Sequence, residues 1–335
     1  MIVSFVSKKG GVGKTTSSVS VAAALAFLGH RTLLVDLDSQ ASASLSFGIA
    51  RQDLAPSAFD LLFGRLPAAA VVRQTPHPRL DLVTASVDLV SADVELAPLR
   101  DRELALRRRL EPLREAYDWI LFDCPPTLSV VPLNALAASD GFVVPVPPQP
   151  LATDGIELLL EAAERLRVRF GFGPRLFGLL PTMVDYRTRL ARTTVAWLRE
   201  RYGDQVFASE VSTNIRLAEL PGTGRDIFDL DPAARGARAY LTVATELVAR
   251  ARGERPLPAA PREAGKQTAA QGPPAPAAES RPDSPSGAPV AGTEPKAALE
   301  PDREVAAPPS SPLPVDLFEI DRPAEARIET ASNEE

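Results

Sequence analysis

Short apolar runs alternate with longer helical stretches along the first 250 residues of the chain. The runs are rich in Val, Ile, Leu and Phe, and most of them end at Asp, Gly or Pro. Runs of this length and composition are typical of strands that are buried on both faces of a sheet. We therefore predict strands at residues 2–6, 31–36, 80–85, 118–123, 141–146 and 175–180.

The segments between these runs have helical spacing. Residues 15–28 (TTSSVSVAAALAFL) are small and apolar, and Gly29 after them fits a helix C-cap. We predict further helices near residues 154–169, 188–202 and 236–251, and one long charged helix at about 88–115. Strands that alternate with helices predict an α/β fold, with a mostly parallel twisted sheet and helices on both faces.

Composition changes after residue 252. Residues 253–335 hold 16 of the 33 prolines and carry 15 acidic against 8 basic residues, whereas residues 1–252 are nearly neutral. We predict an α/β domain at 1–252 and a disordered, Pro/Ala-rich acidic tail at 253–335. Within the tail, LPVDLFEIDRPAEARI (313–328) alternates apolar and acidic residues. That pattern is either incidental composition or a short docking motif for a partner.

Several classes of protein are excluded by what the sequence lacks. No apolar run reaches the roughly 18 residues that a membrane-spanning helix needs. Residues 1–6 lead straight into a glycine-rich loop, which leaves no room for a signal peptide, so we expect a cytoplasmic protein. The single cysteine, Cys124, excludes an internal disulfide and a multi-cysteine metal site within one chain.

A candidate phosphate-binding loop, SKKGGVGKTT (7–16), lies between the first predicted strand and helix. Its glycines let backbone N–H groups turn toward phosphate oxygens, and the helix N-terminus adds a positive end. In such loops the lysine before the helix reaches the β- and γ-phosphates, and the following hydroxyl binds Mg²⁺. Lys8 stands where the common pattern has its first glycine. The predicted nucleotide-binding residues are Gly10, Gly11, Val12, Gly13, Lys14, Thr15 and Thr16.

Three carboxylates follow predicted strands. Asp36 and Asp123 each end a buried strand, and Asp38 lies two residues further along the chain. Ligands bind at the carboxyl ends of parallel strands, so we expect Asp123 to point toward the Mg²⁺ position. Phosphoryl transfer depends mainly on positioning and charge neutralisation, which these groups can provide.

KGGVGKTT (9–16) matches the deviant Walker A box of the ParA/MinD ATPases, a family that the chain resembles over about residues 1–250. LLVDLDSQASAS (33–44) resembles the switch segment of the family, and YDWILFDCPPTLS (117–129) resembles its Walker B strand with the following switch. The match continues toward the ParA branch in residues 131–146, 182–190 and 214–232. The resemblance implies a P-loop NTPase fold, an ATP substrate with Mg²⁺, and a homodimer that sandwiches the nucleotides.

The resemblance also implies roles for single residues. Lys9 would reach across the dimer to the partner's nucleotide, while Lys14 acts within its own subunit and Asp38 orients the attacking water. Thr15, Asp36 and Asp123 would surround the metal. Asn214 matches the adenine-side loop, although Ser212 and Thr213 replace the usual Pro-Arg before it. For Lys8, a solvated flanking position and an extra phosphate contact both stay open.

The ParA branch binds DNA without sequence preference, and the resemblance assigns DNA contact to Arg187. Arg189, Arg216 and Arg225 are further candidates for phosphate contacts, although a run of arginines can equally be a solvated face. The function expected from the resemblance is segregation of DNA or positioning of cellular cargo on the nucleoid. A ParB-like or cargo-adaptor protein would stimulate ATP hydrolysis.

Other members of the same superfamily are alternatives to a ParA-like protein. A MinD-like or flagellar-number ATPase would need a C-terminal amphipathic helix for the membrane, and RIETASNEE (327–335) is acidic, so we do not expect membrane binding. A nitrogenase-type reductase needs two cluster cysteines, and a non-catalytic scaffold would not need Lys9, Lys14 and Asp38. A bacterial tyrosine kinase would want a tyrosine-rich tail, yet no tyrosine follows Tyr240. An orphan ParA that serves one cargo stays open, because one residue precedes the first predicted strand and the tail is long and acidic.

Overall fold

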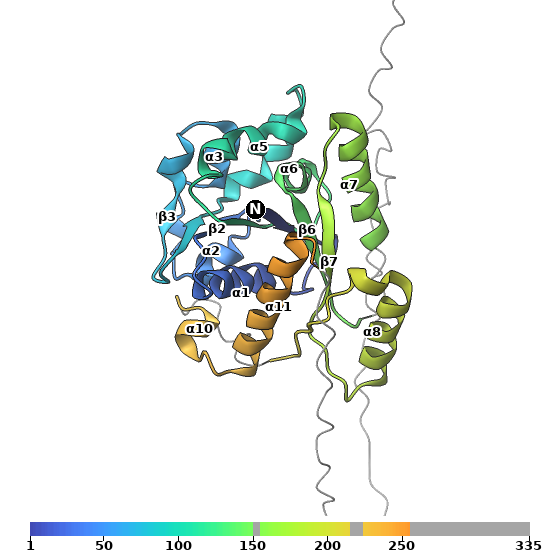
Figure 1. Ribbon diagram of the computed structural model, residues 1–335. Helices are drawn as coiled ribbons and strands as arrows, with labels where there is room; N and C mark the ends of the chain where they lie inside the picture. The colour runs from blue at the N-terminus through green and yellow to red at the C-terminus, as the bar shows by residue number, and fades with distance from the viewer. Residues whose placement is uncertain (150–154, 215–223, 255–335) are drawn as a thin grey trace, which may run out of the picture. The chain divides into compact units, whose positions relative to one another are not determined.

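A sheet of seven strands runs through the part of the chain that the computed structural model describes, residues 1–149, 155–214 and 224–254. Its order is β3–β4–β2–β5–β1–β6–β7 (Figure 1). Neighbouring strands are parallel, except that β3 is antiparallel to β4. The strands are β1 (Ile2–Phe5), β2 (Thr32–Asp36), β3 (Arg73–Gln74), β4 (Leu80–Val83), β5 (Trp119–Asp123), β6 (Gly141–Val146) and β7 (Arg175–Pro181). The predicted α/β fold with a mostly parallel sheet is confirmed.

Helices cover both faces of this sheet (Figure 1). They are α1 (Lys14–Phe27), α2 (Ser42–Ser46), α3 (Ala58–Phe63), α4 (Ala92–Leu96), α5 (Ala105–Leu110), α6 (Val130–Ala138), α7 (Ile156–Phe170), α8 (Arg189–Tyr202), α10 (Ile227–Leu230) and α11 (Arg235–Ala251). Short 3-10 helices are η1 (Arg51–Asp53), η2 (Ala68–Val71), η3 (Val87–Val90), η4 (Arg102–Leu104), η5 (Glu111–Leu113) and η6 (Gly203–Gln205). The helices expected near 15–28, 154–169, 188–202 and 236–251 correspond to α1, α7, α8 and α11.

Alternate residues of the central strands enter two separate cores. Leu33 and Val35 of β2 pack in the core beneath α3, α5 and α6, whereas Leu34 packs in the core beneath α1 and α11. Successive side chains of a strand point to opposite faces, so both faces must be apolar when both are covered. This explains why the central strands are continuous apolar runs rather than alternating ones.

The predicted long helix at 88–115 is wrong. That stretch forms η3, α4, η4, α5 and η5 in succession. Pro98 is the second residue after α4, and Asp101 has a positive φ of 51° that a helix cannot continue through. The composition of residues 88–115 is typical of a solvent-exposed helix. Pro98 and Asp101 nevertheless divide the stretch into short helical segments.

Helix α1 is enclosed between the sheet and α11. Residues 21–26, VAAALA, are all buried, and their small side chains let the helix approach both neighbours. Ser17 Oγ lies 3.1 Å from the hydroxyl of Tyr240 on α11, which gives both buried hydroxyl groups a partner. The helix that begins at the phosphate-binding loop is therefore fixed on two sides.

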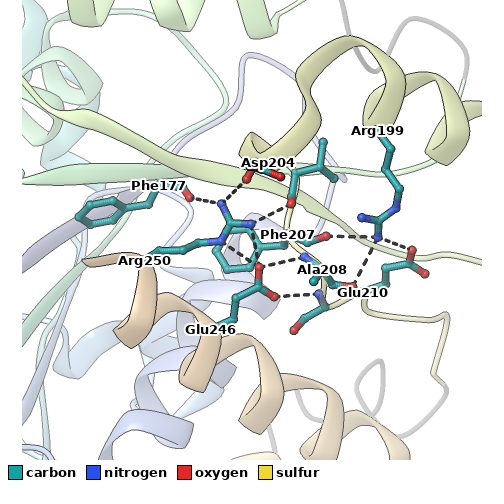
Figure 2. Close-up of polar contacts among 10 residues, drawn as sticks. Phe177, Arg199, Asp204, Phe207, Ala208, Glu210, Glu246 and Arg250 are labelled. Atoms are coloured by element: carbon teal, nitrogen blue, oxygen red, sulfur yellow. Dashed lines mark hydrogen bonds and ion pairs between the residues drawn. The ribbon is translucent and has the colours of Figure 1, made fainter. Parts of the chain in front are cut away.

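A buried ion pair on α11 holds the segment that follows α8 (Figure 2). Arg250 Nε donates to Glu246 Oε1 at 2.9 Å, and its terminal nitrogens donate to the carbonyls of Phe177, Asp204 and Val206 at 2.8–2.9 Å. Buried ions are tolerated when each donor and acceptor finds a partner, as here.

The carboxylate of this pair continues the network toward α8. Glu246 accepts from the backbone N–H groups of Ala208 and Ser209 at 2.9 and 2.8 Å. From the other side, Arg199 of α8 donates to Glu210 Oε1 at 2.9 Å (Figure 2). The network thus joins α11, residues 204–210 and α8 into one unit.

The predicted domain boundary and the predicted tail are not tested by the described residues. The described residues all lie in one compact unit, Met1–Ala264, but the boundary at residue 252 stays a prediction. The structure describes no residue after 254. The predicted disordered tail, apart from its first two residues, and its motif at 313–328 therefore lie outside the described residues. Among the described helices, none has both the length and the apolar character needed to cross a bilayer.

We predict that Arg250→Leu destabilises the fold by about 3–5 kcal/mol, because Glu246 is then left buried without its counter-charge. Urea unfolding followed by circular dichroism measures the effect. The control is Arg252→Leu on the same helix end, where Arg252 is exposed and a change within about 0.5 kcal/mol is expected. Equal effects of the two substitutions would contradict the structural role of the pair.

Candidate nucleotide-binding site

The loop between β1 and α1 has the backbone conformation of a phosphate cradle. Gly11 and Gly13 adopt φ of 69° and 87°, in the left-handed region that favours glycine. A Cβ at Gly10 or Gly11 would meet no atom within 4 Å, so this part of the loop is open. Helix α1 begins at Lys14 without a side-chain cap and without an acidic residue in its first turn. Its first N–H groups and its positive end therefore suit an anion.

Lys14 is enclosed at the base of this loop. Its side chain is buried, and Nζ donates to the carbonyl of Lys9 at 3.4 Å. Burial lowers the pKa of Lys14, while the nearby carboxyl of Asp123 acts in the opposite direction. A buried ammonium is stabilised by a close anion, and a nucleotide phosphate in the loop would supply one.

Lys9 and Lys8 are placed differently from Lys14. Lys9 is only partly buried, and its Nζ forms an exposed hydrogen bond of 3.5 Å to Gln149 Oε1. Lys8 is exposed. The three lysines of the loop therefore lie in three environments, and only Lys14 is built into the cradle of its own subunit.

Asp36 and Asp123 lie side by side at the carboxyl ends of β2 and β5. The register of the sheet pairs Asp36 with Asp123 and Asp123 with Phe5, the last residue of β1. The sheet thus brings the two predicted carboxylates to the edge where α1 begins. Because both are fully buried and close together, burial and mutual repulsion raise the pKa of Asp123.

Asp36 is already engaged within the protein. Its Oδ2 accepts from the backbone N–H and the hydroxyl of Ser44 at 2.8 and 2.7 Å, and its Oδ1 accepts from the N–H of Asp38 at 3.2 Å. Burial raises the pKa of Asp36 and these hydrogen bonds oppose the increase. Its direct observed role is to hold residues 38–44 against β2, and its predicted place in the metal shell stays a prediction.

Asp123 is the carboxylate that lacks a partner. Both of its oxygens are buried and neither makes a hydrogen bond within the described structure. The hydroxyls of Thr15 and Ser18 lie near enough to lower its pKa, but burial and the charge of Asp36 outweigh them. An unpartnered buried carboxylate is unfavourable in an empty protein, and a cation would relieve it.

These residues fit Mg²⁺ bound together with a nucleotide. The described residues contain no group of three His, Cys, Asp or Glu side chains that could cage a metal alone. Mg²⁺ commonly needs only one or two protein ligands, because waters and substrate phosphates complete its shell. Asp123 and Thr15 would hold it here, with charge neutralisation of the phosphates as its contribution.

Asp38 lies at the start of the segment that Asp36 holds. It is half-buried, and its Oδ1 accepts from the N–H of Gln40 at 3.0 Å. Ala41 follows with a positive φ of 56°, and its N–H donates to the carbonyl of Asp38 at 2.7 Å. Asp38 is thus part of a tight turn beside the site, and its role in orienting water stays a prediction.

The sequence did not identify two residues that support the site. Thr182, directly after β7, donates from Oγ1 to the carbonyl of Val12 at 2.9 Å and so braces the phosphate loop. Ser44 is the other, through its bonds to Asp36. No local pattern marks Thr182, since its effect depends on β7 ending beside the loop. Ser44 lies in a Ser- and Ala-rich stretch in which several hydroxyls are equivalent by sequence.

Asn214 follows a short segment that pairs with the residues after β7. Ser212 pairs with Val184 in an isolated parallel bridge, and Thr213 Oγ1 donates to the carbonyl of Met183 at 3.2 Å. The Met183 side chain in turn lies 3.6 Å from the position of a Cβ at Gly13. Asn214 lies two residues beyond this bridge, and its predicted contact with adenine stays a prediction.

Cys124 follows Asp123 and is fully buried. Burial, together with the charge of Asp123, raises the pKa of its thiol well above the usual value. A thiol with a raised pKa is a poor nucleophile, so the residue packs as a small apolar side chain.

Of the predicted DNA-contacting arginines, the structure describes three. Arg187 is 91% exposed and forms a two-pronged ion pair with Asp185, with nitrogen–oxygen distances of 2.7–3.1 Å. Arg189 is exposed at the first turn of α8, and Arg225 is exposed just before Asp226, which caps α10. Arg216 lies outside the described residues. The structure therefore brings Arg187 and Arg189 together at one end of α8.

Comparisons with known proteins agree with this geometry. A family model described as an AAA domain matches residues 1–171. The chromosome-partitioning ATPase Soj of Thermus thermophilus is 42% identical over 248 residues, which cover 74% of this chain and 95% of that protein. The sporulation initiation inhibitor protein Soj of Bacillus subtilis is 37% identical over 248 residues, covering 74% and 98%.

A solved structure is similar over nearly its whole length. The crystal structure of cobyrinic acid a,c-diamide synthase from Mycobacterium smegmatis with bound ADP and magnesium has a TM-score of 0.67 and 30% sequence identity. The match covers 78% of this chain and 99% of that one.

We predict that Asp123→Asn stabilises the nucleotide-free protein by more than about 1 kcal/mol, because it removes a buried carboxyl whose pKa is raised. A carboxyl with a raised folded-state pKa destabilises the fold above its ordinary pKa. The gain should therefore grow as pH rises above about 4 and vanish below it. Thermal unfolding from pH 4 to 8 measures it.

The same substitution should abolish the extra stabilisation that ATP with Mg²⁺ gives to the wild type. Asp81→Asn is the control, since Asp81 is a half-buried carboxylate that accepts a 2.7 Å hydrogen bond from Tyr117. It should bring no gain in nucleotide-free stability. A lower melting temperature for Asp123→Asn at pH 7 would contradict this account of the carboxyl pair.

Proposed function

The chain belongs to the ParA/MinD family of P-loop ATPases, on its Soj-like ParA side, and we propose that it works as an ATP-switched dimer that binds DNA. It is an ATPase that uses ATP with Mg²⁺. The observation that carries the proposal is the different placement of Lys14 and Lys9. One lysine is enclosed in its own phosphate loop, and the other is near the surface.

Within one subunit, the proposed duties follow from burial and charge. The N–H groups of the loop and of the first turn of α1 bind the phosphates. The buried ammonium of Lys14 neutralises part of the negative charge of the phosphates. Asp123 and Thr15 hold the cation, and Asp36 keeps the switch segment in place. Asp38, on that segment, orients the attacking water. This arrangement supplies positioning and electrostatic stabilisation, which dominate phosphoryl transfer.

Between subunits, Lys9 is proposed to complete the site. Its ammonium lies near the surface and donates to Gln149 Oε1 at 3.5 Å, a distance at which a hydrogen bond is weak. A lysine delivered from a partner subunit adds positive charge where negative charge develops, as arginine fingers do. This would couple ATP binding to dimerisation and dimerisation to hydrolysis.

The proposed DNA-binding residues are Arg187, Arg189, Arg216 and Arg225. The ion pair of Arg187 with Asp185 is exposed, and exposed pairs contribute little to stability, so a DNA phosphate can replace the carboxylate. Dimerisation would double the number of arginines that contact one duplex. Affinity that depends on phosphate contacts falls steeply with salt.

The proposed role in the cell is movement or spacing of a cargo along the nucleoid. Cycles of ATP binding, DNA binding and hydrolysis, stimulated by a ParB-like or cargo-adaptor protein, would release the dimer near its cargo. Segregation of DNA and positioning of a protein complex use the same cycle and differ in the cargo. The motif at residues 313–328 is a candidate docking segment for the adaptor.

We predict that Lys9→Ala and Lys14→Ala separate nucleotide binding from dimerisation. Lys14→Ala should weaken ADP binding at least tenfold, because the enclosed cation is lost. Lys9→Ala should keep the ADP affinity of the wild type but remain monomeric with a slowly hydrolysed ATP analogue. Fluorescent-nucleotide titration and sedimentation velocity measure the two steps. A dimer of Lys9→Ala with wild-type affinity would refute the role of Lys9 in the partner site.

We predict that Arg187→Ala with Arg189→Ala leaves the ATP-dependent dimer intact and lowers its affinity for random-sequence DNA. The slope of log affinity against log salt should become shallower by about 1 for each phosphate contact that is lost. Co-sedimentation with DNA, with ATP or ADP across a salt series, measures this. Arg165→Ala on α7 is the control, because Arg165 is also an exposed arginine beside a carboxylate. Equal salt slopes for all three proteins would exclude Arg187 and Arg189 from the DNA contact.

A further inference from the structure

Two glycines from distant parts of the chain contact each other through their backbones. Gly48 and Gly224 adopt φ of 77° and 70°, in the left-handed region. A Cβ on Gly48 would lie 2.9 Å from the Cα of Gly224, well inside the roughly 3.5–4.0 Å at which carbon atoms pack. A Cβ on Gly224 would lie 3.4 Å from the Cα of Gly48. Position 48 therefore accepts only glycine while this contact is kept.

Gly48 ends a segment that begins at Asp38 and is held by Asp36 at the nucleotide edge. Backbone hydrogen bonds connect its successive turns. The N–H of Ala41 donates to the carbonyl of Asp38 at 2.7 Å. The N–H of Leu45 donates to Ala41 at 2.9 Å, and the N–H of Gly48 donates to Leu45 at 3.0 Å. The segment is therefore one hydrogen-bonded unit from Asp38 to Gly48.

Gly224 precedes Arg225 and the first turn of α10. Arg225 is exposed and is one of the proposed DNA-binding residues. Asp226 caps the helix, since its Oδ1 accepts from the N–H groups of Phe228 and Asp229 at 2.7 and 3.1 Å. A displacement of Gly224 therefore displaces Arg225 and the start of α10 with it.

The capping carboxyl of α10 is only partly satisfied. Oδ2 of Asp226 is buried and makes no hydrogen bond within the described structure. His77 Nε2 lies 3.9 Å from it, beyond hydrogen-bond distance. Burial raises the pKa of Asp226. A buried carboxyl without full hydrogen bonding destabilises its own segment, and the less stable segments of a fold are those that move most readily. Helix α10 is therefore the mobile side of the glycine contact.

A second connection between α10 and the nucleotide site runs through α1, which lies beside it (Figure 1). Phe228 stacks on Phe27, the last residue of α1, with ring centroids 5.2 Å apart. Phe27 is 55% exposed, so its ring can rotate and absorb a small displacement. The glycine contact has no side chain that could rotate, so a displacement of one backbone displaces the other.

We propose that the contact between Gly48 and Gly224 transmits the occupancy of the nucleotide site to α10 and Arg225. ATP with Mg²⁺ engages Asp38 and shifts its segment, and Gly224 follows Gly48. The duty of Arg225 toward DNA rests on the proposed function, whereas the response of α10 requires neither DNA nor a second subunit. Gly48 and Gly224 are positioning residues in this scheme, because they act only through Asp38 and Arg225.

The first test is hydrogen exchange of residues 227–231 in the full chain, followed by mass spectrometry. The N–H groups of Phe228, Asp229, Leu230 and Asp231 all donate within α10 or to its cap, so their exchange reports the stability of this helix. In the wild type, a slowly hydrolysed ATP analogue with Mg²⁺ should change their exchange rates by about fivefold or more. Gly48→Ala should abolish this change and keep the affinity for the analogue.

The matched control is Gly171→Ala at the C-terminus of α7. Gly171 has a φ of 75°, and an added Cβ would meet no atom within 4 Å. This variant has the same backbone strain without a contact, so it should keep the wild-type response. Gly224→Ala is the second variant and decides the matter if Gly48→Ala does not fold. Its Cβ fits at 3.4 Å and separates the two backbones, so the response should fall by about half or more.

The second test measures the effect on DNA. The affinity for random-sequence DNA with the ATP analogue is divided by the affinity with ADP. Gly48→Ala should lower this ratio by about tenfold or more, because the coupling free energy between the two sites is lost. Gly171→Ala should keep the ratio. Sedimentation velocity on the same samples should show that Gly48→Ala associates as the wild type does.

The outcomes separate the glycine contact from the proposed function. Equal exchange of residues 227–231 with and without nucleotide in the wild type overturns the contact's role, and so does a full response in Gly48→Ala. A response that Phe27→Ala removes and Gly48→Ala keeps assigns the connection to α1 and also overturns it. A wild type that binds no DNA with any nucleotide overturns the proposed function, and the exchange measurement still decides the role of the glycines.

Discussion

The arrangement at the nucleotide edge depends on two carboxyl groups buried on neighbouring strands. Asp36 and Asp123 face each other in register at the ends of β2 and β5, and only Asp36 has hydrogen-bond partners. The pair is unfavourable in the empty protein, because each carboxyl is dehydrated and repels the other. Lys14 relieves part of this repulsion from the phosphate loop. The site therefore favours binding of a cation together with a nucleotide.

The same carboxyl pair connects the interior of the site with the outer surface. Asp36 holds Ser44, and Ser44 holds Ala85 at the entrance to η3. On the other side, the chain from Asp123 leads into α6, whose first turn donates to Asp93 of α4. These hydrogen bonds tie the segments that follow both carboxylates to the stretch from Ala85 to α4.

Helix α11 gives the C-terminal half its fixed position. It packs on α1 through Tyr240 and Ser17, and its Glu246–Arg250 pair satisfies the backbone of residues 204–210. That segment continues to the bridge at Ser212 and so to Asn214. Helix α1, which begins at the phosphate loop, and the segment between α8 and Ser212 are therefore anchored on one shared helix.

The sequence by itself determined six of the seven strands, the mostly parallel sheet, the glycine loop and the ends of strands at which Asp36 and Asp123 lie, and it missed the two-residue strand β3. These features depend on local composition, on the two-residue period of strands and on glycine conformation, all of which can be seen in short windows. The prediction from the sequence was wrong at residues 88–115. The many charged residues there indicated one long helix, but Pro98 and Asp101 divide the stretch into short segments. Only the tertiary structure decided that Asp36 is engaged and Asp123 is not, and that Thr182 braces the loop. The physical reason is that hydrogen-bond partners and burial depend on segments distant in sequence, which no local pattern specifies.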